Sequence, residues 1–224
     1  MSAKLKHSPF YSVFFPPKDT TPIKTVSLRQ TYRFQVKPEQ KIIDVPWVIF
    51  DLETTGFSRE SDRIIELGGM KYMGTKEVDH FSTLVKVDRV IPKEVQKLTG
   101  INPAMLEGKP RISEAIPKFI EFIKGSVLIC HNSSFDIPMM EAELSRQNMV
   151  LDYPCLCTLK MARDLLSDLP SKKLTSLAEH YQVAYHTQHR SLDDARVTGI
   201  VFRNMLESLS LSSTYASLAR YYHS

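Results

Sequence analysis

The spacing of the hydrophobic positions changes several times along this chain, and each change predicts a separate element. Trp47–Phe50 is a continuous apolar run, which is typical of a central strand covered on both faces. Two following strands, expected to be antiparallel neighbours, are predicted at residues 63–73 and 78–86. Shorter buried strands are expected at residues 126–130 and 155–158, so the pattern predicts five strands before any composition is considered.

Helical spacing separates the later strands. The apolar positions between residues 112 and 123 recur every three or four residues, so we expect a helix that stops at Gly125 and carries Pro117 in its first turn. A helix is also expected from about 137 to 147, with Pro138 in its first turn. Three strands in series followed by alternating helices and strands predict an α/β fold, a mixed five-stranded sheet flanked by helices. Further helices are expected at residues 92–98, 159–167, 174–181 and 192–209.

The two ends of the chain have a different character from its centre. Residues 1–45 are predicted to be a basic N-terminal arm, because Pro, Thr, Ser and Lys are frequent there and Pro46 marks a boundary. Within the arm, residues 26–37 alternate between apolar and polar, which predicts a half-buried strand that could pair with an edge of the main sheet or with another molecule. The alternative is a disordered arm with accidental alternation. The main domain is expected at residues 46–209.

Residues 210–224 are predicted to form a C-terminal helix or tail. Tyr215, Leu218, Ala219 and Tyr222 follow helical spacing, and Ser213 could cap the helix.

Composition places the chain among soluble globular proteins. Its 224 residues are 42% hydrophobic, which is enough for one domain with a real core. We expect an unexported, cytoplasmic protein, because no apolar run is long enough to cross a bilayer and none follows the first lysines. Cys130, Cys155 and Cys157 are expected to be buried free thiols, since an odd number of cysteines argues against a disulfide framework.

The charge is unevenly distributed. The net charge is +4, but residues 1–46 hold eight basic and three acidic residues, which leaves −1 for the rest. The basic residues are concentrated in the N-terminal arm, and the main domain is nearly neutral. This distribution is expected of a domain whose acidic residues bind cations.

The first candidate for chemistry is the pair Asp51 and Glu53, directly after the run Trp47–Phe50. Residues i and i+2 of a strand share a face, so both carboxylates would project together from the end of a buried strand. Burying them costs several kcal/mol, roughly, unless a charge compensates, and Mg²⁺ prefers such oxygen ligands. The alternative is a solvated acidic turn.

Two later segments carry further acids. His131-Asn132-Ser133-Ser134-Phe135-Asp136 follows the strand predicted at 126–130 and places Asp136 near a helix N-terminus, where an ordinary N-cap is the alternative role. In the second segment His189 precedes the acidic pair Asp193 and Asp194 at the start of a long helix. A loop histidine near acids could act as a general base, although a surface histidine before a capped helix is the alternative.

The order of these motifs resembles the DnaQ-like exonucleases of the DEDDh type, a family that includes the proofreading epsilon subunit of bacterial replicative DNA polymerase. The resemblance covers residues 46–206. It rests on five segments, which are Phe50-Asp51-Leu52-Glu53-Thr54-Thr55-Gly56, Ile64-Ile65-Glu66-Leu67-Gly68, Leu98-Thr99-Gly100-Ile101, His131-Asn132-x-x-Phe135-Asp136 and His189-x4-Asp194-Ala195.

The resemblance implies an RNase H-like fold and a two-metal mechanism. It assigns Asp51, Glu53, Asp136 and Asp194 as ligands of two Mg²⁺ or Mn²⁺ ions, and His189 as the base that takes a proton from the attacking water. The product would be a nucleoside 5′-monophosphate from a 3′ end. The spacing of the last motif favours Asp194 over Asp193 as the ligand.

The resemblance also implies substrate contacts. Thr54, Thr55 and Gly56 would touch the terminal nucleotide, and Phe135 would pack beside its sugar or base unless it is a core residue. One departure is that Leu98-Thr99-Gly100-Ile101 lacks the histidine that many relatives carry before the glycine, which weakens any prediction about that loop.

Three functions remain open at this point. The first is a DNA 3′→5′ exonuclease for proofreading or repair, acting on a single-stranded or frayed 3′ end. The second is an exoribonuclease that trims RNA 3′ ends, since the contacts that read a 2′-hydroxyl cannot be located in the sequence. The third is a catalytically inactive nucleic-acid-binding module. The basic arm could follow phosphates, or dock on a polymerase subunit or a second copy of the chain.

Overall fold

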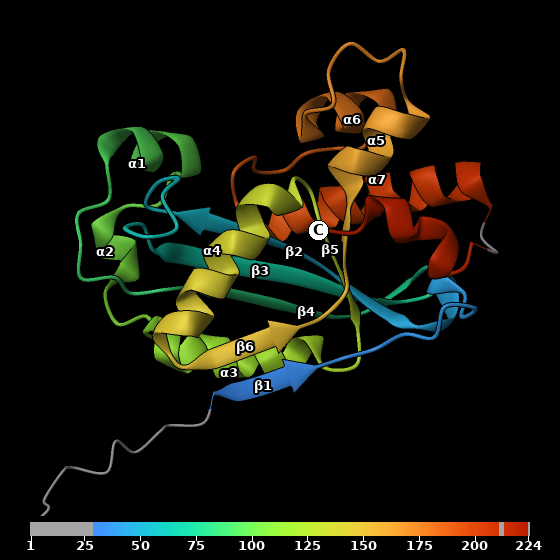
Figure 1. Cartoon of the computed structure of the whole chain (residues 1–224). Coiled ribbons are helices and arrows are strands. Elements are labelled where there is room, and N and C mark those ends of the chain that lie inside the picture. Colours follow the sequence, from blue (N-terminus) through green and yellow to red (C-terminus); the bar gives the residue numbers. More distant parts are fainter. Residues whose placement is uncertain (1–28, 211–212, 224) are drawn as a thin grey trace, which may run out of the picture.

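A mixed five-stranded sheet forms the centre of the structure, a computed structural model that describes residues 29–210 and 213–223 (Figure 1). The strand order is β4-β3-β2-β5-β7. The β2–β3 and β3–β4 pairs are antiparallel and the β2–β5 and β5–β7 pairs are parallel, which confirms the predicted fold class. The strands are β2 (Pro46–Thr54), β3 (Ile64–Met73), β4 (Lys76–Leu84), β5 (Val127–Cys130) and β7 (Cys155–Cys157).

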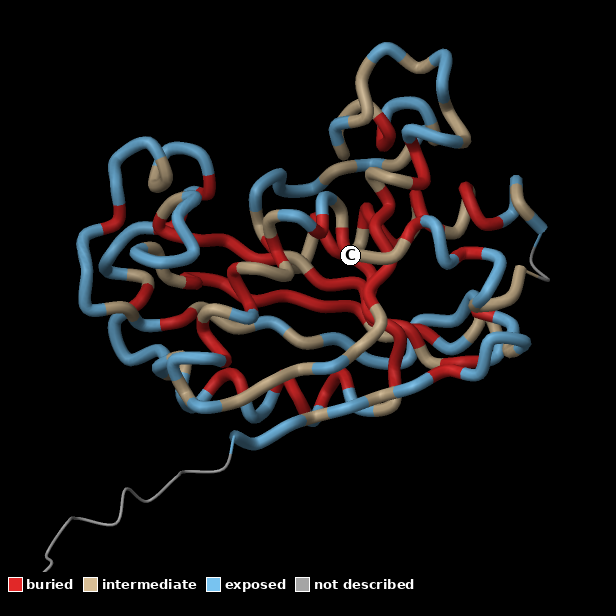
Figure 2. The backbone as a smooth tube through the Cα atoms, viewed as in Figure 1, coloured by how far each residue is buried: buried red, intermediate tan, exposed pale blue. Residues whose placement is uncertain are grey.

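The alternation along β2 gives the sheet two differently covered faces. Trp47 and Ile49 belong to the hydrophobic cluster that includes α7, whereas Val48 and Phe50 belong to the cluster that includes α3 and α4. The sheet is therefore buried between helices, as Figure 2 shows. The helices are α1 (Lys93–Thr99), α2 (Pro103–Leu106), α3 (Ile112–Ile123), α4 (Ser133–Arg146), α5 (Thr158–Leu165), α6 (Leu174–His180) and α7 (Ser191–Leu209), with a 3₁₀ turn η1 (Ile42–Asp44) before β2.

Helix α7 lies close against the sheet. The Trp47 ring stacks on Tyr72 at 4.5 Å between centroids and meets Phe202 of α7 edge-on at 5.2 Å. At the other end of the helix, a Cβ atom on Gly68 of β3 would lie 2.5 Å from the backbone nitrogen of Leu192. Only a glycine permits this approach, which brings the first turn of α7 over the end of β2.

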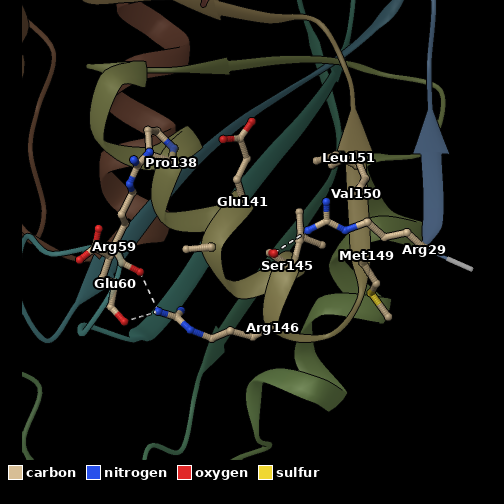
Figure 3. A pocket seen from close by; sticks show the side chains of 12 residues that line it. Arg29, Arg59, Glu60, Pro138, Glu141, Ser145, Arg146, Met149, Val150 and Leu151 are labelled. Carbon is tan, nitrogen blue, oxygen red and sulfur yellow. Dashed lines mark hydrogen bonds between the residues drawn. The ribbon is translucent and has the colours of Figure 1, made fainter. Parts of the chain in front are cut away.

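The turn after β2 is tied to helix α4 (Figure 3). Arg63 donates two hydrogen bonds, of 2.6 and 2.9 Å, to Glu143, whose side chain is only 1% exposed. Arg146 donates to the backbone carbonyls of Arg59 and Glu60 at 2.6 and 2.9 Å. These contacts hold the turn and the helix together, and Arg59, Glu60 and Arg146 line a cavity of about 650 Å³.

A strand forms within the range predicted at 26–37, but it is shorter and its partner was not predicted. β1 (Gln30–Arg33) pairs in parallel with β6 (Met149–Asp152), and neither strand belongs to the main sheet. Residues 26–28 lie outside the described part of the chain. The rest of the described arm packs on the main body, since Ile42 is fully buried. The division at residues 45 and 46 stays a prediction.

Two proline positions were predicted wrongly. Pro117 and Pro138 are each the sixth residue of their helix, α3 and α4, and do not lie in the first turn. Each removes one backbone hydrogen bond. The buried apolar residues of both helices offset that loss, so each helix continues through its proline. Helix α4 begins at Ser133, four residues before the expected start.

The C-terminal segment is a short 3₁₀ helix, η2 (Ala216–Tyr221), and not an α-helix. Leu218 and Tyr221 are buried, and residues three apart share a face in 3₁₀ geometry. Ser213 does not cap it; the Ser217 amide instead donates to the Thr214 hydroxyl at 3.3 Å.

The three cysteines are buried and unpaired, with the Cys130 and Cys155 sulfurs 3.6 Å apart. Among the described residues, no helix combines the length and the apolar character needed to cross a membrane.

Candidate active site

The end of β2 presents the first two acids. Asp51 and Glu53 continue the row of Trp47 and Ile49, so they face the N-terminal turn of α7. In the β2–β3 register Asp51 lies opposite Gly68, and Glu53 lies opposite another acid, Glu66. The predicted pair therefore points away from α3 and towards the helix that carries the last motif.

The other two acids come from the first turns of α4 and α7. Asp136 is 2% exposed and accepts hydrogen bonds from its own backbone amide and from that of Leu52, which lies between the two acids of β2. It is the fourth residue of α4, so the alternative of an ordinary N-cap is wrong. Asp194 is 7% exposed. Negative charge is favoured in both positions by the helix dipole.

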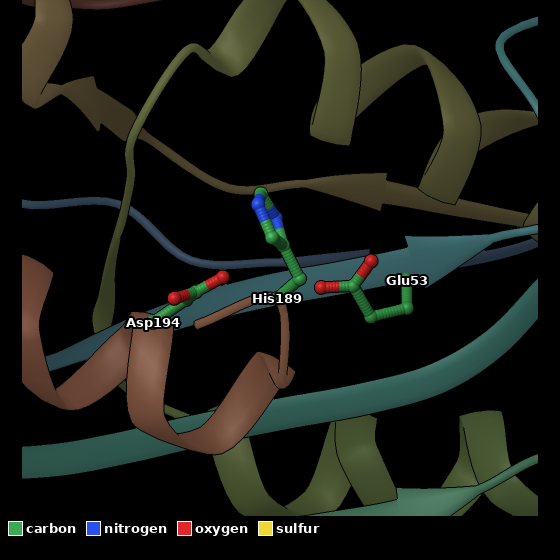
Figure 4. A group of neighbouring side chains, drawn as sticks. All are labelled: Glu53, His189 and Asp194. Carbon is green, nitrogen blue, oxygen red and sulfur yellow. The ribbon is translucent and has the colours of Figure 1, made fainter. Parts of the chain in front are cut away.

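His189 completes the group. One ligand atom each from Glu53, His189 and Asp194 lies within 4.8 Å of the others, and the three side chains converge in Figure 4. A cation bound at about 2.1 Å from each ligand can bridge atoms about 4 Å apart. His189 has a left-handed backbone, with φ of 58°, which is uncommon for a residue other than glycine. Such conformations are often retained where function requires them.

All five predicted side chains open into one cleft of about 990 Å³. Phe135 also lines it, and its ring contacts the 87% exposed Phe57 at 5.8 Å between centroids. Phe135 therefore stands at the wall of the cleft, within reach of a bound molecule.

The turn Thr54-Thr55-Gly56 is not among the residues that line this cleft. The Thr54 hydroxyl donates to the Gly56 carbonyl at 2.6 Å, and the Thr55 hydroxyl donates to Asp62 at 2.8 Å. A Cβ atom on Gly56 would lie 2.5 Å from Asp62. The hydroxyls of the two threonines are thus engaged within the turn, and the predicted contact of these residues with a nucleotide stays a prediction.

The structure distinguishes the two neighbouring acids of α7. Asp193 accepts hydrogen bonds from the backbone amides of His186 and Thr187 and from Arg196, at 2.7–2.8 Å. Its pKa is lowered by these bonds, although burial opposes them. Asp193 therefore stabilises the loop, while Asp194 faces the cleft.

The four acids of the cleft strongly perturb one another. Burial, and then the charges of the neighbouring acids, raise the pKa of Glu53 to about 8 and the pKa of Asp51 well above its usual range. Burial also raises the pKa of Asp136 to about 8, against hydrogen bonds that lower it. Burial raises the pKa of Asp194 as well. The protein alone therefore does not hold all four as carboxylates at neutral pH, which is the situation that a bound cation corrects.

Sequence reasoning missed two partners of these residues. The Tyr185 hydroxyl donates to Asp194 at 2.6 Å, and the buried Glu66 accepts from Arg190 at 2.7 Å and from the Ser191 amide at 3.0 Å. Glu66 belongs to the motif Ile64-Ile65-Glu66-Leu67-Gly68, but the motif does not show that Arg190 is its partner. The contact of Tyr185 with Asp194 could not be predicted, because the loop that carries Tyr185 has no periodic pattern of apolar residues.

Comparisons with known proteins agree with this geometry. The family model described as Exonuclease (RNase_T) matches residues 48–202. The epsilon subunit of DNA polymerase III from Aquifex aeolicus is 35% identical over 175 residues, which is 78% of this chain and 87% of that protein. The PolC-type DNA polymerase III of Caldanaerobacter subterraneus is 40% identical over 163 residues, but the 73% of this chain that matches spans only 12% of that longer protein.

Among solved structures, Exonuclease X in complex with 5′ overhanging duplex DNA matches with a TM-score of 0.62 and 25% identity, over 78% of this chain and 98% of the other. The chain therefore belongs to the RNase_T exonuclease family, and its exonuclease domain is homologous to the epsilon subunit of DNA polymerase III and to the DEDDh 3′→5′ exonucleases.

Proposed function

We propose that this chain is a metal-dependent 3′→5′ exonuclease that removes nucleoside 5′-monophosphates from DNA ends, in proofreading or repair. The observation that carries the proposal is the convergence of four acids and His189 in one open cleft, where Glu53, Asp136 and Asp194 are buried and Asp51 is half-buried. All five groups expected for catalysis are present together. That arrangement speaks against an inactive binding module, which would have no need to bury mutually repelling acids.

The donors fit divalent cations. The group offers carboxylate oxygens from β2, α4 and α7, which are the ligands that Mg²⁺ and Mn²⁺ prefer. Four carboxylates exceed what one ion needs beside water and phosphate, which supports the proposal of two ions. Two bound ions would stabilise the attacking and the leaving oxygen of an in-line displacement.

The protein's own groups supply the remaining steps. His189 would accept the proton of the attacking water, and Asp51, Glu53, Asp136 and Asp194 would hold the ions. The cleft wall at Phe135 would orient the terminal nucleotide beside them.

DNA is favoured over RNA as the substrate. Two relatives that share 40% and 35% identity with this chain are named as a PolC-type DNA polymerase III and as the epsilon subunit of DNA polymerase III, and the Exonuclease X structure holds DNA. We further propose that the chain works beside a replicative polymerase. The described part of the arm, including β1, is a candidate contact surface for that partner or for a second copy of the chain.

A degradation assay tests the proposal. Labelled single-stranded DNA, duplex DNA with a mismatched 3′ end and RNA would each be incubated with Mg²⁺, with Mn²⁺ and with EDTA. We expect 5′-monophosphates to be released stepwise from the 3′ ends of the DNA substrates, and no release in EDTA. Degradation that persists in EDTA, or that starts from the 5′ end, would rule the proposal out. Faster degradation of RNA would establish the exoribonuclease alternative.

The pH dependence of metal-free stability gives a further prediction. Glu53 and Asp136 have a folded-state pKa of about 8, against 4.5 and 3.8 in the unfolded chain. The folded state therefore binds more protons, so its free energy of unfolding falls as the pH rises towards 8. We expect a loss of about 2 kcal/mol between pH 7 and pH 8.5 in EDTA, measured by urea unfolding.

The window above pH 7 keeps histidine titration small. Adding Mn²⁺ should restore stability more at pH 8.5 than at pH 7, because ligands must be deprotonated to bind. Equal or higher stability at pH 8.5 in EDTA would contradict the prediction.

Tyr185→Phe is expected to weaken Mn²⁺ binding about 10-fold or more, because hydrogen bonds to ligands orient them. The Tyr185 hydroxyl is a donor at neutral pH, since burial and the bond to Asp194 raise its pKa. Calorimetric titration with Mn²⁺ measures the effect. Tyr181→Phe, which alters a half-buried tyrosine packed on the core, is the matched control and should change the affinity less than twofold. Wild-type affinity in Tyr185→Phe would show that the bond does not serve the ligand.

A further inference from the structure

The cleft has two walls of opposite charge. All its acidic lining residues, Asp51, Glu53, Asp136 and Asp194, lie at the ends of β2, α4 and α7. Arg163 of α5 and Lys172 and Lys173 of the α5–α6 connection line the same cleft and form what we call the basic rim. The rim belongs to an element pair that stands beyond the end of β5 in Figure 1.

His131 attaches the rim to the sheet. Its Nδ1 atom lies 2.9 Å from the Thr158 hydroxyl at the start of α5, and its ring also hydrogen-bonds the Lys172 backbone. Burial lowers the pKa of His131 to about 4, so the ring is neutral at physiological pH. The neutral ring links the end of β5 to the start of α5 and to the backbone of Lys172. Lys172 itself donates to the carbonyls of Ser167 and Leu169. The α5–α6 connection therefore has a defined place in the cleft wall.

Two cations of the rim are available to a ligand. Within residues 29–210 and 213–223, the side chains of Arg163 and Lys173 make no ion pair and no hydrogen bond, and both residues are exposed. The nearest acid in sequence, Asp164, is bound by Arg220 at 3.1 Å and by the Tyr221 hydroxyl. These two cations are thus not neutralised by the protein.

We propose that Arg163 and Lys173 bind backbone phosphates of the nucleic-acid strand on the 5′ side of the terminal nucleotide. This inference rests on the proposed function, because it takes the 3′ end to lie at the acidic wall. The acids repel every phosphate that is not shielded by a bound cation. A strand that reaches them needs fixed cations for its following phosphates, and an Arg–Lys pair without partners supplies them independently of sequence.

The test compares two substrates with one double variant. Arg163→Gln with Lys173→Gln removes both charges, and Lys76→Gln with Lys118→Gln removes two exposed charges of β4 and α3 that do not line the cleft. Each protein is assayed on a 20-nucleotide single strand and on the p-nitrophenyl ester of thymidine 5′-monophosphate, which has no upstream phosphate. For the rim variant we expect KM on the 20-mer to rise at least 10-fold, with kcat and the kinetics on the ester unchanged.

Salt dependence gives a second readout. The slope of log affinity against log salt for the 20-mer, measured in Ca²⁺ to prevent cleavage, should become shallower by about 1.4 in the rim variant. An unchanged KM and slope, or an equal change in the control variant, would overturn the proposal. An equal loss on the ester would place these residues at the reacting nucleotide instead. If the wild-type chain hydrolyses neither substrate, the proposed function fails, which is distinct from failure of the rim alone.

Discussion

Asp51→Asn is expected to lower kcat on single-stranded DNA at least a thousandfold while it raises the melting temperature in EDTA. The loss of activity follows from the position of Asp51 on β2, beside Glu53 and facing the acids of α4 and α7. An amide keeps the shape but removes the charge that would hold the ions. A thousandfold loss corresponds to about 4 kcal/mol of transition-state stabilisation.

The gain in stability has the same origin. Burial and the neighbouring acids raise the pKa of Asp51 well above its usual range. Ionisation of Asp51 at pH 8 therefore lowers the free energy of unfolding of the metal-free protein. An asparagine cannot ionise, and we expect it to stabilise the metal-free protein by about 1–2 kcal/mol at pH 8. Mn²⁺ should stabilise the wild type but not the variant.

The exposed Asp79 of β4 provides the control. Asp79→Asn removes a carboxylate outside the cleft, so it should leave kcat and the effect of Mn²⁺ on melting unchanged. Asp51→Asn with wild-type activity would show that the acids of β2 do not form the catalytic site. An inactive variant that is also less stable in EDTA would show that the charge of Asp51 is not a burden to the fold.

Glu66→Ala is expected to lower the free energy of unfolding by about 2–3 kcal/mol and to abolish most activity. Glu66 is 2% exposed and accepts three hydrogen bonds from Arg190 and one from the Ser191 amide. Removing Glu66 leaves the Ser191 amide and the Arg190 guanidinium without their acceptor, and solvent compensates only in part, because the Arg190 side chain is 34% exposed. His189 precedes these two residues directly, so its placement depends on the same contact.

Urea unfolding and single-strand degradation measure the two effects. Arg111→Ala is the comparison, because its pair with Asp88 is exposed and should contribute less than about 1 kcal/mol. Replacing both members, with Glu66→Met and Arg190→Met, should recover much of the stability, since a buried ion pair can be exchanged for apolar packing. It should not recover activity if Arg190 places His189. A loss below 1 kcal/mol in Glu66→Ala would contradict the prediction.

The parts that could be predicted from sequence are those governed by local pattern. The apolar run before Asp51 predicts a central strand, and the alternation that buries Trp47 also aims Asp51 and Glu53 at α7. The resemblance of the motif order to the DEDDh exonucleases implied which residues would meet, and these residues do line one cleft. The start of α4 was missed because Pro138 was given the first-turn position that proline usually takes.

Contacts between distant segments could not be predicted where the family motifs do not link them. β6 pairs with β1, which lies far away in the sequence, and the alternation at residues 26–37 predicts a strand without showing which segment that strand joins. The engagement of the Thr55 hydroxyl with Asp62, and of Tyr185 with Asp194, depends on the path of two loops. No residue pattern fixes such a path.

The distribution of the catalytic group over three elements has a consequence for biosynthesis. Asp51 and Glu53 leave the ribosome early, Asp136 follows with α4, and His189 and Asp194 arrive late, just before and within the first turn of α7. A nascent chain that ends before residue 189 lacks the proposed base and one proposed ligand, however well its β2 and α4 are formed. Helix α7 also packs on Trp47, so we expect nuclease activity to arise only when synthesis of the domain is nearly complete. We expect shorter ribosome-bound fragments to leave the nucleic acids around them intact.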